Sequence, residues 1–127
     1  GPADGVWGLW PVGGAWLAFH MWEHYLFTQD KDFLKDEAYE FIRQCAKFVL
    51  NYMVEDKEGR LMFGPSMSPE NRYYDKDKNV CLLTLNSAMD VGIITTLLNI
   101  YLTAPKFWAL PMKTPPAPLL PCLKSPL

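Results

Sequence analysis

The hydrophobic and polar positions of the chain predict three helices of two different kinds. Apolar side chains cover nearly the whole circumference of residues 13–28, and they do so again from about residue 84 to residue 102. A helix that is apolar all round must be surrounded by protein. Residues 34–52 instead carry apolar side chains every three or four positions and charged ones between them, which predicts an amphipathic helix on the outside. Asp30 or Asp32 is placed to cap that helix.

A connection of about thirty residues, 54–83, separates the second predicted helix from the third. Residues 55–59 read as a turn, and residues 60–63 as a possible short strand. Most connections in compact domains are only a few residues long, and long structured ones are usually functional. We therefore expect this loop to carry functional side chains.

The order of an enclosed, an amphipathic and another enclosed helix predicts an all-α fold of the double-layered α/α barrel type. Inner helices of such a barrel are covered on both sides. Three helices are about a quarter of a barrel of this kind, so most of their apolar surface would lack its partners. The remainder of the parent barrel is therefore an expected partner of residues 1–104.

The character of the sequence changes after Thr103. Seven of the eleven prolines lie in residues 105–127, and no acidic residue occurs there. Repeated proline forbids a continued helix, so we expect this tail to be extended or disordered. It resembles a frameshifted, read-through or mispredicted end, and a proline-rich tail that binds a partner is the alternative.

Composition narrows the class of protein. The 127 residues are 50% hydrophobic and 14% aromatic, enough for one core and one domain. The net charge of −2 gives no reason to expect nucleic acid or an anionic membrane as a partner. The apolar stretches 13–21 and 91–102 are shorter than the roughly 18–20 residues of a membrane span. The chain opens with Gly1 and shows no signal peptide, so we expect it to begin inside a longer protein.

Three cysteines, Cys45, Cys81 and Cys122, are widely spaced. Their spacing matches neither a disulfide framework nor a zinc-ligand pattern. Cys45 lies on the apolar stripe of the second helix, where a small core residue is the favoured interpretation over a reactive thiol.

Three segments, in this order, carry a resemblance to a known family: Gly13-Gly14-Ala15-Trp16, Trp22-Glu23-His24-Tyr25 and Ser68-Pro69-Glu70-Asn71. Together they resemble the catalytic domain of family 95 glycoside hydrolases, the inverting α-L-fucosidases, over about residues 7–102. The resemblance implies an (α/α)6 barrel, a fucosylated oligosaccharide as substrate, no cofactor, and a secreted or periplasmic location.

Glu70 matches the general acid of that family. Inversion needs one protonated carboxyl to donate to the departing oxygen and a separate base to activate water. Pro69 fixes the approach of the loop, and Ser68 and Asn71 can bond the local backbone and orient it. A loop glutamate that makes only a local hydrogen bond is the alternative interpretation.

The base has no counterpart in this chain. Asp75 and Asp77 lie in a run of alternating charges that reads as a solvated turn. Asp90 matches an aspartate that the family carries near the start of the third helix. The helix dipole alone can explain a carboxylate there, and a contact with a sugar hydroxyl is the functional alternative.

A polar stripe interrupts the first apolar helix, because Trp16, His20, Glu23, His24 and Phe27 share one face. Such a face can stack on a sugar and bond its hydroxyls, and the resemblance adds Trp22 and Asn71 to the expected substrate-binding residues. Histidines satisfied within the core are the alternative. His20 to His24 also spells His-x-x-Glu-His, but no third histidine is present and we expect no metal site.

The sequence thus predicts a fragment of an inverting α-L-fucosidase that carries the acid without the base and is inactive alone. The alternative is a non-catalytic, truncated helical or carbohydrate-binding remnant.

Overall fold

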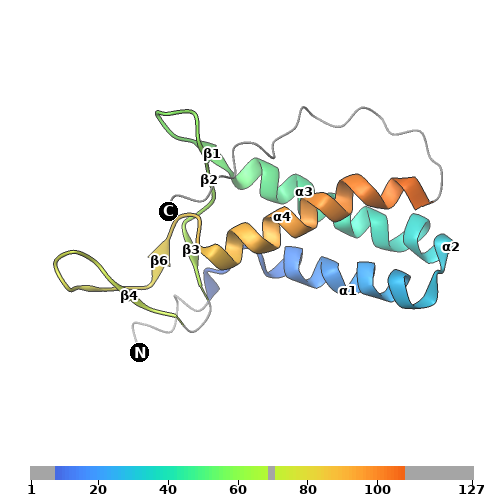
Figure 1. The fold of residues 1–127 in the computed structure, drawn as a ribbon, viewed down its shortest axis with the longest axis horizontal. Coiled ribbons are helices and arrows are strands. Elements are labelled where there is room, and N and C mark those ends of the chain that lie inside the picture. Colours follow the sequence, from blue (N-terminus) through green and yellow to red (C-terminus); the bar gives the residue numbers. More distant parts are fainter. Residues whose placement is uncertain (1–7, 69–70, 108–127) are drawn as a thin grey trace.

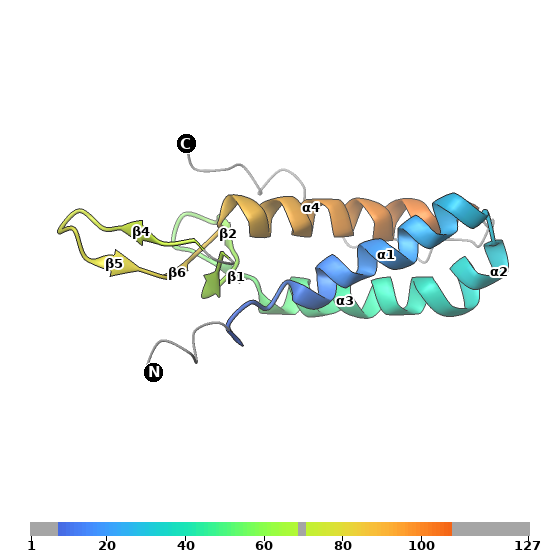
Figure 2. The ribbon, with the colours of Figure 1, turned by 90° about the horizontal axis from the view of Figure 1, so that it is seen from below.

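Three long helices lie side by side, and three pairs of short strands gather at one end of them, called here the hairpin end (Figures 1 and 2). The computed structural model describes residues 8–68 and 71–107. Helices α1 (Gly13–Thr28) and α4 (Ala88–Thr103) both begin at the hairpin end, and α3 (Tyr39–Tyr52) runs back toward it (Figure 1). Each of the three helices contacts the other two. The fold is therefore mostly helical, with the starts of α1 and α4 at the same end.

The predicted bounds of the first helix, 13–28, are confirmed. A short α2 (Lys31–Phe33) and a π-helical turn, η2 (Leu34–Ala38), lead into α3. Asp30 caps α2, because its Oδ1 accepts a hydrogen bond of 2.9 Å from the Phe33 amide. The second predicted helix is thus confirmed, with a π-helical turn that the sequence did not predict.

The third helix begins later than residue 84. Thr84 belongs to a strand, Asn86 has a left-handed backbone with a φ of 51°, and the helix starts only after Ser87. Ser87 accepts a hydrogen bond of 3.1 Å from the Asp90 amide, and this cap fixes the start of α4. The prediction of a helix from residue 84 was therefore wrong by four residues.

The helical region extends past Thr103 as a 3-10 turn, η3 (Ala104–Phe107). Pro105 is buried in this turn, so the first residues of the predicted tail are not extended. Pro105 has no N–H with which to continue the α-helical hydrogen bonds, and α4 accordingly ends just before it, at Thr103. The rest of the predicted tail, residues 108–127, lies outside the described residues.

Six short strands form three antiparallel pairs. They are β1 (Val54–Glu55) with β2 (Leu61–Met62), β3 (Ser66–Met67) with β6 (Leu83–Thr84), and β4 (Tyr73–Tyr74) with β5 (Val80–Cys81). The predicted turn at 55–59 and the strand within 60–63 are confirmed by the first pair. The prediction of an all-α fold therefore missed these small sheets.

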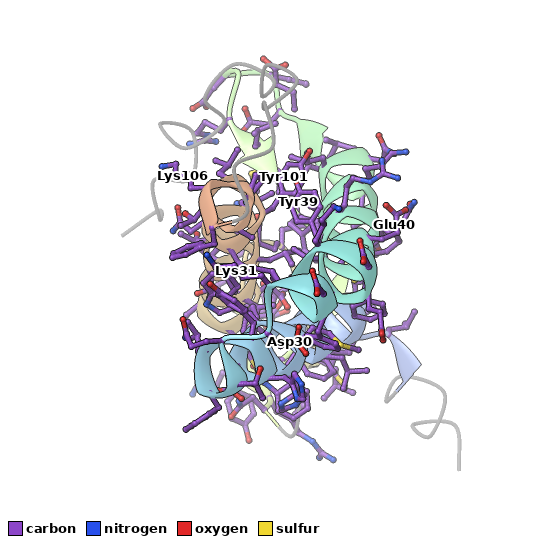
Figure 3. All side chains as sticks on the ribbon, turned by 90° about the vertical axis from the view of Figure 1, so that its right-hand side faces the viewer. Asp30, Lys31, Tyr39, Glu40, Tyr101 and Lys106 are labelled. Atoms are coloured by element: carbon purple, nitrogen blue, oxygen red, sulfur yellow. The ribbon has the colours of Figure 1, made fainter. Side chains whose placement is uncertain are left out.

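The core lies between the three helices and under the hairpin end. Tyr39 and Tyr101 face each other between α3 and α4, with stacked rings 5.8 Å apart (Figure 3). Cys45 is half-buried where α3 meets α1, and its Sγ donates to the Gly14 carbonyl at 3.4 Å. Burial raises the pKa of this thiol, as expected for a core cysteine. The larger buried side chains are Tyr25, Leu34, Ile42, Val49, Phe63, Ile94 and Leu97.

One face of α1 has no covering in the described residues. Trp16 is 45% exposed, Leu17 51%, Leu26 48% and Phe27 90%. This is the surface that the sequence predicted to need partners. The closed barrel itself stays a prediction, because the described residues contribute only these three long helices.

The stretch Ala88–Phe107 forms a continuous helical segment of 20 residues, longer than the apolar stretch seen in the sequence. By length and composition alone it could cross a membrane, and among the described residues one helix meets this description. This segment is partly buried, because α4 packs on α1 and α3. Core helices of globular proteins can be equally long and apolar, so length and composition alone do not indicate a membrane span.

Candidate functional site

The loop that carries Ser68 and Asn71 is fixed at both of its ends to the same strand, β6. At its start, Ser66 pairs with Thr84 and Met67 pairs with Leu83. At its end, the Tyr73 hydroxyl donates a hydrogen bond of 2.7 Å to the Leu83 carbonyl. The predicted acid, Glu70, and its neighbour Pro69 lie outside the described residues. The frame that holds their loop is nevertheless defined on both sides.

The segment that leads into β3 is anchored to the ends of two helices. The Tyr52 hydroxyl, at the end of α3, donates to the Pro65 carbonyl at 3.1 Å. The ring of Tyr52 lies 4.9 Å from that of Phe63, which is fully buried. The Met67 amide donates to the Leu9 carbonyl at 3.0 Å, just before α1. The loop therefore leaves from a segment with little freedom.

Asn86 ties the same segment to the start of α4. Its Oδ1 accepts a hydrogen bond of 2.7 Å from the Phe63 amide, and its Nδ2 donates to the Leu61 carbonyl at 3.2 Å. Its own amide donates to the Phe63 carbonyl at 2.9 Å. A left-handed backbone is a conformation that asparagine tolerates better than most residues. One side chain thus joins β2, the entry to β3 and the N-terminus of α4.

Ser68 and Asn71 bond each other across the predicted acid. The Asn71 amide donates to the Ser68 carbonyl at 3.1 Å, and Asn71 Nδ2 donates to Ser68 Oγ at 3.2 Å. The two side chains thus bond each other, and the predicted bonds from these side chains to the local backbone stay a prediction. A contact between Asn71 and substrate stays a prediction, and the exposure of Asn71 leaves room for it.

The polar face predicted on α1 is solvent-exposed and stretched along the helix. Trp16 and His20 lie near the hairpin end with ring centroids 5.7 Å apart, and His20 Nδ1 lies 3.6 Å from Glu23 Oε2. His24 lies further along, where its ring is 4.3 Å from that of Phe33. Eight residues of helix between Trp16 and His24 span roughly 12 Å. Trp16 and His20 are therefore the members of this face nearest the loop.

Trp22 faces a different way. Its ring lies 5.4 Å from Tyr25, which is buried, and 5.7 Å from Phe107. These are contacts of a side chain packed against the core, and Trp22 is only partly exposed. A role for Trp22 in binding substrate stays a prediction.

Asp90 is fully buried in the first turn of α4. Its Oδ2 accepts a hydrogen bond of 2.8 Å from the Ser87 hydroxyl, which completes a reciprocal cap with the Asp90 amide. Its Oδ1 has no partner among the described residues, and neither has the buried Ser66 hydroxyl. The capping role accounts for one oxygen, and the sugar contact stays a prediction that would involve Oδ1.

The remaining carboxylates of the long connection lie in tight turns. Asp75 Oδ1 accepts hydrogen bonds of 2.8 Å from the amides of Asp77 and Asn79, and Asn79 Nδ2 donates to Asp75 Oδ2. The bonds from Asn79 hold the pKa of the Asp75 carboxyl below its usual range. The predicted solvated turn is confirmed, and nothing in these contacts suggests a base.

No group of three or more His, Cys, Asp or Glu side chains that could hold a metal ion occurs in residues 8–68 and 71–107. His20, Glu23 and His24 therefore gain no further ligand from the described residues. The expectation of no metal site rests on the sequence argument.

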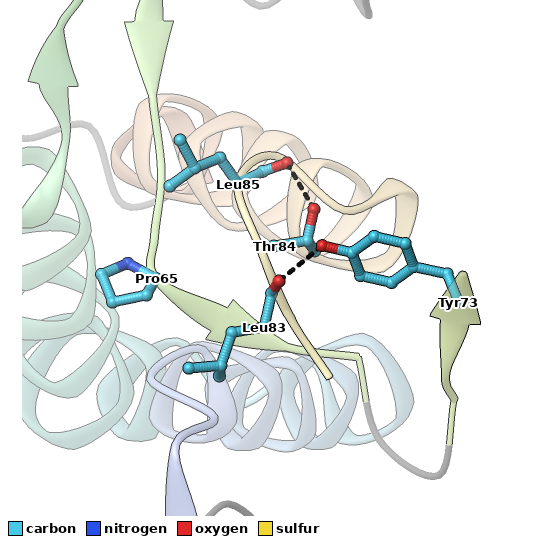
Figure 4. Close-up of a pocket in the computed structure, with 5 residues that line it drawn as sticks. All are labelled: Pro65, Tyr73, Leu83, Thr84 and Leu85. Carbon is cyan, nitrogen blue, oxygen red and sulfur yellow. Dashed lines mark hydrogen bonds between the residues drawn. The ribbon is translucent and has the colours of Figure 1, made fainter. Parts of the chain in front are cut away.

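An open pocket of about 420 Å³ lies beside the loop frame. Its lining consists of Pro65, Tyr73, Leu83, Thr84 and Leu85 (Figure 4). Figure 4 shows the Tyr73 ring reaching from β4 to β6, where its hydroxyl meets the Leu83 carbonyl. Sequence reasoning missed these residues and Asn86. The signal for Asn86 was its place directly before the Ser87-x-x-Asp90 cap, and no signal distinguished Tyr73 from other aromatic residues.

Comparisons with known proteins agree on one family. The model of the glycosyl hydrolase family 95 catalytic domain matches residues 2–113. Alpha-L-fucosidase 2 of Arabidopsis thaliana is 42% identical over 91 residues, which cover 72% of this chain and 11% of that protein. Probable alpha-fucosidase A of Aspergillus niger is 32% identical over 68 residues, or 51% of this chain and 9% of that protein. The chain thus spans about a tenth of the length of these curated relatives.

Proposed function

The chain belongs to glycosyl hydrolase family 95, and from that membership we propose that it supplies the acid loop of an enzyme that releases terminal α-L-fucose from oligosaccharides. Glu70 is the general acid and protonates the oxygen that leaves the sugar. A separate base, located outside this chain, activates water on the opposite face and inverts the anomeric centre. No cofactor takes part.

The observation that supports this role is the double attachment of the loop to β6. General acids act only when they are held within hydrogen-bond reach of the atom they protonate. Pairing of β3 with β6 fixes the residues before Glu70, and the bond from the Tyr73 hydroxyl to the Leu83 carbonyl fixes those after it. A carboxyl held between two such attachments can be positioned against a substrate bound at the hairpin end.

The parent barrel completes the site in this proposal. Helices α1 and α4 are the inner helices and α3 is an outer one, which fits the 90% exposure of Phe27 on α1. Trp16, His20, Glu23 and His24 then line the sugar site from α1, together with Asn71 of the loop. The isolated chain lacks the base and therefore releases no fucose by itself.

The test uses a hybrid enzyme in which this chain replaces the matching segment of the Arabidopsis protein. We expect the hybrid enzyme to release fucose from fucosyllactose, and Glu70→Gln to lower kcat by about 10³-fold, within the range for loss of an acid catalyst. The same variant should keep most of its activity on fucosyl fluoride, because fluoride leaves without needing a proton.

Glu58→Gln is the matched control, since Glu58 lies in the exposed turn between β1 and β2 and pairs with Arg60 at 3.1 Å. It should leave both activities unchanged. Equal activity of Glu70→Gln and the unmodified hybrid enzyme on fucosyllactose would overturn the acid role. Fucose release by the isolated chain would overturn the proposal that its base lies elsewhere and favour a complete site within these residues.

A further inference from the structure

Three buried side-chain atoms have no hydrogen-bond partner within residues 8–68 and 71–107: Trp10 Nε1, Ser66 Oγ and Asp90 Oδ1. Ser66 and Asp90 are fully buried residues. Most buried polar atoms of native proteins are paired, either with protein or with ordered water, because an unpaired one has lost its bonds to solvent without replacement. These three atoms therefore need a partner that protein groups of the described residues do not supply.

The three atoms belong to segments that meet at the hairpin end. Ser66 lies in β3, which pairs with β6, and β6 leads through the cap of α4 to Asp90. The amide of Met67, next to Ser66, donates to the carbonyl of Leu9, next to Trp10, at 3.0 Å. In Figure 1, β3 and the starts of α1 and α4 lie at the same end of the molecule. Backbone pairing thus gathers the three side chains in one region.

The hydrogen-bonding properties of the three atoms complement those of one water molecule. An indole nitrogen only donates, a carboxylate oxygen accepts, and a hydroxyl does either. A water molecule that accepts from Trp10 and donates to Asp90 still has a hydrogen and a lone pair for Ser66. These are about three bonds, the usual number for a buried water. A metal cation would meet the positive end of the indole N–H, and an anion would meet the Asp90 carboxylate.

We propose that an ordered water molecule is bound inside the hairpin end, where it bridges Asp90 Oδ1, Ser66 Oγ and Trp10 Nε1. The water joins the start of α4 to β3 and to the segment before α1. Asp90 Oδ1 then serves the fold rather than the substrate, in keeping with the complete burial of this residue. The site does not depend on the role of Glu70.

Removal of the Ser66 hydroxyl distinguishes a bound water from an unpaired group. If the hydroxyl bonds a water, Ser66→Ala should lower the thermal midpoint of the chain by about 5 °C, the shift that loss of one hydrogen bond gives in a domain of this size. An unpaired buried hydroxyl destabilises the fold, so its removal would leave the midpoint unchanged or raise it. Either of these two results would overturn the proposal.

Ser87→Ala is the matched comparison. The Ser87 hydroxyl has two partners, because it accepts from the Asp90 amide at 3.1 Å and donates to Asp90 Oδ2 at 2.8 Å. Its loss should lower the thermal midpoint by at least as much as Ser66→Ala. The two substitutions remove the same group from the same residue type, so they differ in the partner of the hydroxyl.

A double substitution tests whether Ser66 and Trp10 share the water. Trp10→Phe removes the indole N–H, and it should also lower the thermal midpoint. No direct bond joins the Ser66 hydroxyl to the Trp10 indole, so without a shared water their effects should add. We expect Trp10→Phe with Ser66→Ala to lose clearly less than the sum, because the first substitution already weakens the binding of the water. Additive losses would overturn a water shared by both side chains.

Water–protein cross-relaxation NMR of the chain detects the water directly. The indole proton of Trp10, identified by its absence in Trp10→Phe, should show a cross-peak with a long-lived water, and Ser66→Ala should weaken it. No such cross-peak in the folded chain would overturn the site.

A crystal structure of the hybrid enzyme gives a test that needs no variant. We expect a water about 2.7–3.2 Å from both Asp90 Oδ1 and Ser66 Oγ. A direct bond between these two oxygens, or the absence of water between them, would overturn the site. Fucose release enters none of these measurements, so the water site and the proposed function can fail separately.

Discussion

The side chain of Asn86 accepts a hydrogen bond of 2.7 Å from the backbone amide of Phe63, which lies 23 residues earlier in the chain. Asn86 directly precedes the cap of α4, and Phe63 is a buried residue that directly precedes the Gly64-Pro65 entry to β3. The start of one helix and the entry to the acid loop are thus fixed by one asparagine. Because both groups are partly buried, loss of this bond would leave a polar backbone group without a partner.

Asn86→Ala should lower the free energy of unfolding by about 3 kcal/mol, from two lost hydrogen bonds and an alanine in a left-handed conformation. Asn86→Gly should lose about 1 kcal/mol less, because glycine adopts that conformation freely. Urea unfolding followed by circular dichroism measures both. Equal losses for the two variants would contradict the strain component, and losses near zero would contradict the hydrogen bonds.

Gly64 lies against the backbone of the residues before α4, at a φ of 145°. A Cβ atom there would lie 2.6 Å from Leu85 Cδ2 and 2.8 Å from the Thr84 carbonyl oxygen. The carbonyl cannot rotate away, so we expect Gly64→Ala to destabilise the fold by about 3 kcal/mol.

Gly92 is the matched control for that substitution. It lies within α4, and a Cβ atom there would meet nothing within 4 Å. Gly92→Ala should therefore stabilise the isolated chain by about 0.5–1 kcal/mol, the helix propensity difference. Thermal unfolding of both variants tests the pair, and a tolerated Gly64→Ala would contradict the close approach of residues 64 and 84.

Tyr39 predicts how stability depends on alkaline pH. Burial, followed by the electrostatic and hydrogen-bond effects of Tyr101, raises the pKa of Tyr39 from 10.0 to about 12. In the unfolded chain the phenol ionises near pH 10, while in the folded chain it keeps its proton. The contribution of Tyr39 is therefore complete below pH 10 and is lost as the pH rises from 10 to about 12.

Tyr39→Phe should remove this part of the alkaline decline, since phenylalanine does not ionise. Between pH 9 and 12 the thermal midpoint of the unmodified chain should fall further than that of the variant. Parallel curves for the two proteins would contradict the shift. Other groups also titrate in this range, so the prediction concerns the difference between the two curves of thermal midpoint against pH.

Periodicity predicted the helices well where local pattern and packing agree. The bounds of α1 were predicted from the apolar run alone, and Asp30 or Asp32 was predicted as a cap, of which the structure selects Asp30. The start of α4 was not predictable in this way, because Leu83 and Leu85 continue the apolar character of the helix. What holds these residues in a strand is the pairing of Thr84 with Ser66, a contact across 18 residues that no local pattern encodes.

In the site, too, local contacts were predictable from the sequence and long-range contacts were not. The short polar side chains of Ser68 and Asn71 indicated local hydrogen bonding, and the structure has a bond between these two side chains. The pocket at Tyr73 depends on a bond to Leu83 across the β4–β5 hairpin, which requires the fold to be known. The shared face of α1 was correct as a helical pattern, but the length of the helix separates His24 from Trp16.

The exposed face of α1 gives a prediction that depends on context. Phe27 is 90% exposed, so Phe27→Lys should change the stability of the isolated chain by less than about 0.5 kcal/mol. In the hybrid enzyme, where we propose that the rest of the barrel covers this face, the same change should cost about 3 kcal/mol, because it removes a buried aromatic side chain and buries a charge. Phe48→Lys on the outer helix α3, where Phe48 is 47% exposed, is the control and should have similar effects in both proteins. Thermal unfolding of the four variants decides the question: an equal effect of Phe27→Lys in both contexts would mean that α1 is not an inner helix.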